Sequence, residues 1–273
     1  EDAITDLNYW SKVDDLKQFA NSFYTTLSGP SASYDTQSDN GVTNSPNDWL
    51  FDNATVPGSG GGWATTDWTN IRNLNYFLSR FHTVEGDEKD INHYVAEIRF
   101  FRANEFFKKV KTFGDIPWVD KDLTTSDTDE LMKGRDSRTF VIDKILEDLD
   151  FAIANLKNPD EIEKGRLHKF AALQMKARVA LHEGTWMKYR GEAGSEKYLE
   201  KAVEASKRIM DEGNYSIPKG EAPYMFEGYP LSYRQQFIQE DLTNNSECIL
   251  PRIYIKDILM HGTSRSANET GWG

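Results

Sequence analysis

The sequence is poor in cysteine, in long apolar runs and in positive charge. Its one cysteine, Cys248, among 273 residues excludes an internal disulfide framework and a metal cage built from thiolates. It contains no run of 18 apolar residues, so it predicts no membrane-spanning helix. With a net charge of −12, the chain would repel a phosphate backbone. Nucleic acid is therefore not expected as a partner.

The signatures of several common catalytic sites are also absent. The sequence has no H-E-x-x-H zinc motif, no phosphate-binding loop, no dinucleotide fingerprint after a strand and no G-x-S-x-G. The glycine-rich run at 57–62 follows no predicted strand and favours a flexible turn. The acidic run at 127–131 lacks the spacing of a calcium loop, and the five histidines show no ligand spacing. We expect no catalytic residue, no bound metal and no cofactor.

Helical periodicity is present through most of the chain. Apolar residues recur at three and four positions, which predicts helices over about 4–27, 63–81, 90–113, 137–156, 167–182 and 196–212. The third of these carries apolar stripes on two sides, which predicts that it lies between neighbouring helices. Strand signals are few, with one short strand expected at 248–255. The predicted fold class is all-α: a degenerate tetratricopeptide-like stack of helix hairpins with long irregular loops.

The segment 31–62 lacks this periodicity and is rich in Ser, Asp, Asn, Gly and Pro, the composition of a loop. A loop of this length inside a compact domain is often functional. Aromatic faces can stack on sugar rings, whereas Asp and Asn can bind the hydroxyl groups. We predict a glycan site in and beside this loop, formed by Tyr34, Asn47, Trp49, Trp63, Asp67 and Trp68. The alternative for Trp63 and Trp68 is a place in the helical core.

Residues 96–119, AEIRFFRANEFFKKVKTFGDIPWV, resemble a segment of the SusD-like (RagB/SusD) nutrient-binding lipoproteins of Bacteroidetes. In that family a helix with Ala-Glu-x-Arg-Phe-x-Arg-Ala is followed by a Phe-Gly-Asp-x-Pro corner. Further segments resemble family elements in the same order, at 68–78, 135–156, 165–184, 202–217 and 244–250. Trp68 stands where the family usually has tyrosine. Members are commonly about twice this length and carry a lipid-bearing N-terminal cysteine that this chain lacks.

This resemblance implies a domain plan, a partner and a location. Residues 1–218 would form the helical SusD-like N-terminal region, and 219–273 the irregular start of a C-terminal region that continues beyond this chain. The protein would be a non-catalytic, surface-exposed lipoprotein of the outer membrane, held by a lipid anchor that is not in this sequence. It would bind oligosaccharide and deliver it to a SusC-like TonB-dependent transporter, as in a starch utilisation system.

Two alternatives come from other functional classes. An all-α glycan hydrolase or lyase also combines helices, aromatic residues and acids, but 44 acidic residues leave no way to choose a catalytic pair from sequence. The second alternative is a helical-repeat scaffold that binds only protein. Release of new reducing ends would identify an enzyme, and a failure to bind any glycan would favour the scaffold.

Overall fold

The computed structural model describes residues 9–27, 48, 50–56, 58, 60–217, 245–255 and 257–260, together with the backbone of two short strands. Within these ranges the chain forms two compact units. The first comprises residues 1–24 and 68–251, and the second comprises 25–67 and 252–273. The domain boundary expected at 218/219 lies outside the described residues and stays a prediction.

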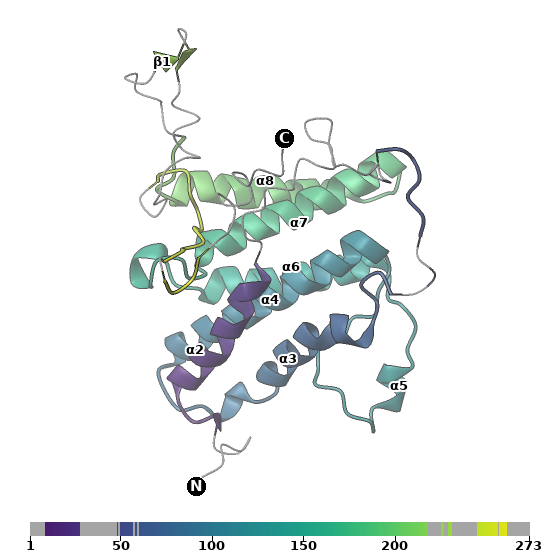
Figure 1. Ribbon diagram of the computed structural model, residues 1–273, viewed down its shortest axis with the longest axis horizontal. Helices are drawn as coiled ribbons and strands as arrows, with labels where there is room; N and C mark the ends of the chain where they lie inside the picture. The colour runs from purple at the N-terminus through teal and green to yellow at the C-terminus, as the bar shows by residue number, and fades with distance from the viewer. Residues whose placement is uncertain are drawn as a thin grey trace. The chain divides into compact units, whose positions relative to one another are not determined.

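The described part of the first unit is built from helices (Figure 1). Its longer helices are α2 (Val13–Asn21), α3 (Thr69–Leu78), α4 (Glu88–Phe113), α6 (Arg138–Asn155), α7 (Lys169–Arg190) and α8 (Ser195–Glu212). Short helical turns are η1 (Ser22–Thr26), η3 (Thr65–Trp68), η4 (Phe81–Thr83), α5 (Thr128–Leu131) and η5 (Pro159–Glu161). Strands β1 (Met225–Phe226) and β2 (Tyr229–Pro230) form one antiparallel pair, in which Met225 lies opposite Pro230.

Successive helices pack against one another as a stack of hairpins. Helix α4 contacts α2, α3 and α6, and α6 contacts α7, which in turn contacts α8. Because α4 has neighbours on several sides, it is buried around most of its circumference, with Ile98, Phe101 and Phe106 inaccessible to solvent. The sequence predicted this two-sided burial. The all-α, tetratricopeptide-like stack is confirmed.

The Phe-Gly-Asp-Ile-Pro-Trp segment forms a corner that joins α4 to α6. Gly114 ends α4 with φ 71° and ψ −110°, a backbone conformation that favours glycine. The Oδ1 atom of Asp115 accepts a hydrogen bond from the backbone N–H of Arg138, in the first turn of α6 (2.8 Å). The backbone N–H of Trp118 donates to Asp136 Oδ2 (2.7 Å). The corner therefore fixes the end of α4 to the start of α6, which a glycine alone could not do.

A buried ion pair joins the middle of α4 to α6. The guanidinium of Arg102 donates from Nε and Nη2 to the two carboxylate oxygens of Asp148, both at 2.7 Å. Its Nη1 donates to Asn75 Oδ1 of α3 at 3.0 Å, and the Asn75 side-chain amide donates to the carbonyl of Val119. All the charged groups are therefore hydrogen-bonded, as a buried charge requires. The network links three helices and the segment after the corner.

A second buried ion pair joins the first half of α4 to the segment just before α7. Glu97 is inaccessible to solvent and accepts hydrogen bonds from Arg166 Nε (2.7 Å) and Nη2 (3.0 Å). The Tyr24 hydroxyl donates to the same carboxylate at 3.0 Å and accepts from the backbone N–H of Leu167 at 2.8 Å. Burial, with the negative charge of Glu97, raises the pKa of Tyr24 well above its usual value. Tyr24 therefore stays neutral and can donate to Glu97.

Helix α7 is longer than its sequence pattern predicts. We expected it to end near His182, but it continues to Arg190 and is capped by Gly191 in the left-handed conformation. Gly184 interrupts the apolar pattern for a packing reason. A Cβ atom at this position would lie 2.7 Å from Leu199 Cγ and 3.0 Å from the Leu199 nitrogen of α8. The glycine therefore allows the two helices to approach closely.

One other local prediction differs from the structure. No strand forms over 248–255, where only an isolated bridge pairs Ile255 with Leu259. Pro251 has no N–H to donate to a ladder, which disfavours the strand that the apolar residues suggested.

His168, which precedes α7, gives a prediction about pH. Its Nε2–H donates to the carbonyl of Ile249 (2.8 Å), while its buried Nδ1 has no hydrogen-bond partner. Burial lowers the pKa of His168 below 6.5, so the unfolded chain binds more protons than the folded chain at acidic pH. The free energy of unfolding should therefore fall as pH is lowered from 7 to 5. We expect His168→Gln, whose amide can still donate, to reduce this pH dependence of Tm, measured by circular dichroism.

The matched control for this measurement is His82→Gln, because His82 is exposed. It should leave the slope of Tm against pH unchanged. An identical slope in wild type and His168→Gln would contradict the assignment.

Candidate functional site

The structure describes three of the six residues predicted to bind glycan. Tyr34, Asn47 and Trp49 lie outside the described residues. Trp63 and Asp67 belong to the second unit, whereas Trp68 belongs to the first. The six-residue site therefore stays a prediction.

Trp63 precedes the turn η3, and Asp67 lies within it. Trp63 is partly exposed, and its backbone N–H donates to the carbonyl of Gly60 (3.1 Å). Asp67 is exposed, and its Oδ2 accepts from the backbone N–H of Ala64 (2.8 Å). One carboxylate oxygen of Asp67 is therefore engaged in holding the turn. The exposure of both side chains is compatible with the predicted contact to a sugar.

Trp68 lies immediately before α3 and is also partly exposed. The Nζ atom of Lys109, from α4, lies 4.4 Å from the centre of the Trp68 ring system. This cation–π contact covers one face of the indole. A ligand that stacks on Trp68 would have to use the other face.

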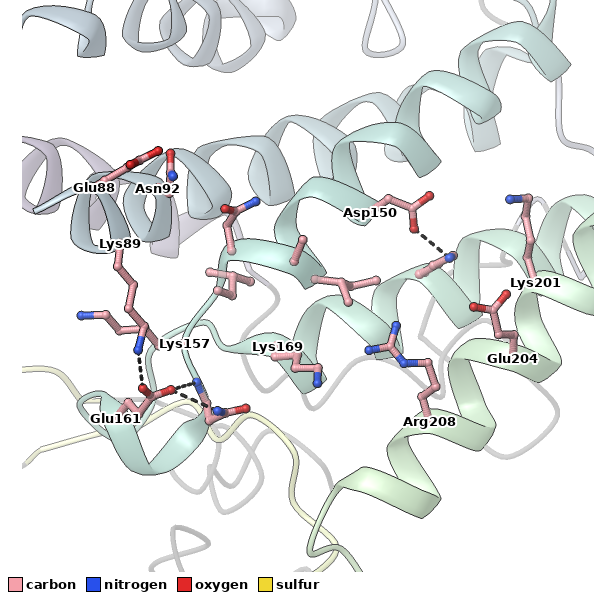
Figure 2. A pocket seen from close by; sticks show the side chains of 16 residues that line it. Glu88, Lys89, Asn92, Asp150, Lys157, Glu161, Lys169, Lys201, Glu204 and Arg208 are labelled. Atoms are coloured by element: carbon pink, nitrogen blue, oxygen red, sulfur yellow. Dashed lines mark hydrogen bonds and ion pairs between the residues drawn. The ribbon is translucent and has the colours of Figure 1, made fainter.

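A groove in the first unit offers a different kind of surface. It has a volume of about 1070 Å³ and lies among the start of α4, the end of α6, the start of α7 and α8 (Figure 2). Among the residues that the structure describes, neither Trp63, Asp67 and Trp68 nor any other aromatic side chain lines it. Its charged lining residues are Glu88, Lys89, Asp150, Lys157, Glu161, Lys169, Lys176, Lys201, Glu204 and Arg208.

The end of the groove between α7 and α8 is organised around one carboxylate. Glu212 accepts hydrogen bonds from Lys169 Nζ of α7 (2.5 Å) and from Arg208 Nε of α8 (2.7 Å). The bond from Arg208, followed by that from Lys169, lowers the pKa of Glu212 to about 2. Glu212 therefore stays ionised at all ordinary pH values. The two cations together hold a single carboxylate group.

Ion pairs also occur along the rest of the groove. Lys176 of α7 lies largely buried against its wall and pairs with Asp150 of α6 (2.7 Å). At the other end, Lys89 of α4 donates to Glu161 of η5 (2.7 Å), as Figure 2 shows. Lys201 of α8 forms no ion pair within the described part of the chain. The groove thus combines paired cations with one unpaired cation.

A smaller hollow of about 450 Å³ adjoins the turn η5. It is lined by His93, Tyr94, Lys157, Asp160, Glu161, Ile162, Glu163 and Arg166. The Arg166 guanidinium lies 5.1 Å from the centre of the Tyr94 ring, and this arginine is already bound to Glu97. The hollow is therefore partly filled by the buried ion pair and offers less to a ligand than the larger groove.

No metal site or membrane span emerges from the described residues. Among them, no three His, Cys, Asp or Glu side chains are arranged to hold a metal ion. No helix among them is long and apolar enough to cross a bilayer.

Comparison with known proteins identifies the family. A model of SusD-like proteins, described as "Starch-binding associating with outer membrane", matches residues 2–181, well over half of the chain. This chain belongs to the SusD-like family. The match includes α2 to α6 and the first half of α7, and hence both buried ion pairs. No curated protein matches the chain.

Solved SusD-like structures share the fold. A SusD-like protein from Bacteroides fragilis is 24% identical, with a TM-score of 0.67 over 91% of this chain and 46% of its own. A SusD-like carbohydrate-binding protein from the same species is 20% identical, with a TM-score of 0.58 over 77% and 42%. A SusD homologue from Bacteroides thetaiotaomicron is 18% identical, with a TM-score of 0.59 over 78% and 43%. The chain spans less than half the length of these relatives.

The SusD-like motif residues have structural positions in this chain. Glu97 and Arg102 of the Ala-Glu-x-Arg-Phe-x-Arg-Ala helix are buried and paired with Arg166 and Asp148. Gly114 forms the corner. The motif therefore identifies the scaffold rather than a ligand site, because its charged groups are directed into the helical stack.

Sequence reasoning did not find the charged groove. Its lining comes from four helices and the turn η5, which are far apart in the sequence. Each lysine taken alone has the pattern of a solvent-exposed helix face. Lys201 and Arg208 carry no motif, and Lys169 lies in the segment 165–184 that resembles the family. Only the packing of α7 against α8 brings the three together.

Proposed function

We propose that this protein binds oligosaccharide at the outer membrane and delivers it to a SusC-like TonB-dependent transporter, without catalysing a reaction. The observation that carries the proposal is the family match over residues 2–181, whose description names starch binding and association with the outer membrane. A solved relative with the same fold is described as carbohydrate-binding. The transporter partner and an N-terminal lipid anchor follow from the family resemblance.

The aromatic residues around 31–68 are the proposed glycan contacts. Trp63 is partly exposed, and Asp67 is exposed. Trp68 has one indole face covered by Lys109. With Tyr34, Asn47 and Trp49, these side chains would supply flat rings for stacking and polar groups for the hydroxyls.

We expect the protein to bind at least one member of a panel of neutral glycans in affinity gels and calorimetry. Trp63→Ala should weaken that binding about tenfold, since a buried aromatic anchor commonly contributes more than about 1 kcal/mol to binding. The matched control is Tyr189→Ala, because Tyr189 is an exposed aromatic residue on α7, outside the predicted site. Equal glycan affinity in Trp63→Ala and wild type would show that Trp63 is not part of the binding site.

The same panel separates the alternatives. New reducing ends after incubation would show a hydrolase and would overturn the non-catalytic proposal. The appearance of unsaturated uronates would show a lyase and have the same consequence. Failure to bind any glycan would favour a protein-binding scaffold. Copurification with a TonB-dependent transporter from the outer membrane of the source organism would test the partner.

A further inference from the structure

The charged groove has a composition that contrasts with the chain as a whole. Among the described residues, six cationic and four acidic side chains line the groove, and two further carboxylates, Asp90 and Glu212, pair with three of these cations. The groove is thus close to neutral in a chain with a net charge of −12, so it repels an anionic ligand less than the surface as a whole does. It is a part of the described surface that can accept an anion.

The geometry favours a ligand with several negative groups over a single small anion. Lys201 and Arg208 lie seven residues apart on α8, two helical turns on the same face, and Figure 2 shows both beside the groove. Two turns of α-helix span about 10 Å, so the two cations lie far enough apart to bind separate anionic groups of one ligand. A chain of anionic units can therefore bind to both at once.

Two cations of the lining, Lys169 and Arg208, already bind a carboxylate beside the groove. They converge on Glu212, at 2.5 and 2.7 Å. These groups are partly exposed, and water and salt weaken an ion pair of this kind. A ligand carboxylate can therefore share or replace Glu212. Lys201, which has no ion pair within the described residues, can bind a second anionic group.

The described lining of the groove has no aromatic side chain, which favours a charged ligand over a neutral sugar. Without a flat ring the groove cannot provide the stacking that the loop region is proposed to supply. Charge-assisted hydrogen bonds from lysine and arginine to carboxylate or sulfate are roughly twice as strong as bonds between neutral groups. The lining therefore fits a saccharide that carries its own negative charges.

We propose that this groove binds an acidic oligosaccharide, one that bears uronate carboxylates or sulfate esters, through Lys169, Lys201 and Arg208. This inference rests on the proposed function, since it names a class of glycan. It adds a second binding surface in the helical unit, distinct from the aromatic residues around 31–68.

The test compares ligands that differ only in charge. Homogalacturonan oligosaccharides and their fully methyl-esterified forms share one backbone, and only the former carries carboxylates. We expect calorimetry to show binding of the acidic form at 50 mM salt and a clear loss of affinity at 500 mM, because salt screens exposed charges. The esterified form should bind at least about tenfold more weakly at 50 mM salt. A sulfated oligosaccharide of similar length tests the other anionic group.

Matched variants assign the binding to the groove. The double variant Lys201→Gln and Arg208→Gln should weaken binding of the acidic form about tenfold or more. Lys188→Gln with Lys207→Gln removes the same charge from exposed positions of α7 and α8 outside the groove. That control should change affinity less than about twofold. Circular dichroism melting confirms that both variants fold.

Each other outcome has a definite meaning. Binding of neutral glycans with no binding of either acidic glycan would overturn this inference and leave the proposed function intact. Failure to bind any glycan would overturn both. Equal loss of affinity in the two double variants would show that net charge, not the groove, is responsible. Binding of poly-glutamate as tight as that of the acidic glycans would reassign the groove to acidic protein segments.

Discussion

Replacing Arg102 by methionine is expected to lower the free energy of unfolding by about 3–5 kcal/mol, the usual cost of leaving a buried charge without its partner. The Asp148 side chain is only 3% exposed and receives both of its short bonds from Nε and Nη2 of Arg102. The nearby Arg99 lies 3.8 Å away, too far to replace them. Asn75 would also lose the donor to its side-chain oxygen. Urea unfolding monitored by circular dichroism gives the measurement.

Two further variants make this prediction specific. Lys144→Met removes an exposed ion pair with Glu147 on the same helix and should lower the free energy of unfolding far less than Arg102→Met does. The double variant Arg102→Met with Asp148→Leu removes both charges and should be more stable than Arg102→Met alone. If Arg102→Met cost as little as Lys144→Met, the pair would not hold α4 to α6.

Substituting Glu97 with alanine should destabilise the protein to a similar extent, by about 3–5 kcal/mol. The substitution leaves Arg166 buried without its bidentate partner and leaves the Tyr24 hydroxyl without an acceptor. It also removes the carboxylate that lies 3.3 Å from His93 Nε2. The Tyr24 hydroxyl also accepts a hydrogen bond from the backbone N–H of Leu167, just before α7. Loss of Glu97 should therefore also loosen the packing of α7.

The control for Glu97→Ala is Glu105→Ala, two helical turns further along α4. Glu105 is itself largely buried, but it pairs with Lys108, whose side chain is 44% exposed, so its removal leaves no buried charge without a partner. We expect a smaller loss of stability at this position than at Glu97. Glu97→Gln keeps an acceptor for Tyr24, so its urea midpoint should lie between those of the two alanine variants. Similar urea midpoints for Glu97→Ala and Glu105→Ala would contradict the structural role of Glu97.

The helices could be predicted because their apolar spacing is a local property of the sequence. The spacing indicated α4, α6 and α8 to within a few residues, and the two stripes of α4 indicated its central place. The end of α7 could not be predicted, because Gly184 is explained only by the approach of α8. Local pattern contains no information about which helices will touch.

The ion-pair partners of the charged residues could not be predicted either, because apolar spacing does not show which helices pack together. Arg102 and Asp148 are separated by 46 positions, and Glu97 and Arg166 by 69. Resemblance to a family marked these residues without showing that they bind one another. The groove was missed because its lysines resemble ordinary solvent-exposed residues until the helices assemble. The predicted aromatic site remains a prediction, since half of it lies outside the described residues.

The location of Glu97 and Arg102 has a consequence for how such a protein can diversify. Both residues are enclosed between helices, so the interactions that maintain the architecture involve no atom available to a nutrient. Substitutions in the loop around 31–68, or of the cations along α8, can therefore change which ligand binds while the melting temperature stays constant. A library that randomises only those positions should yield folded members at high frequency.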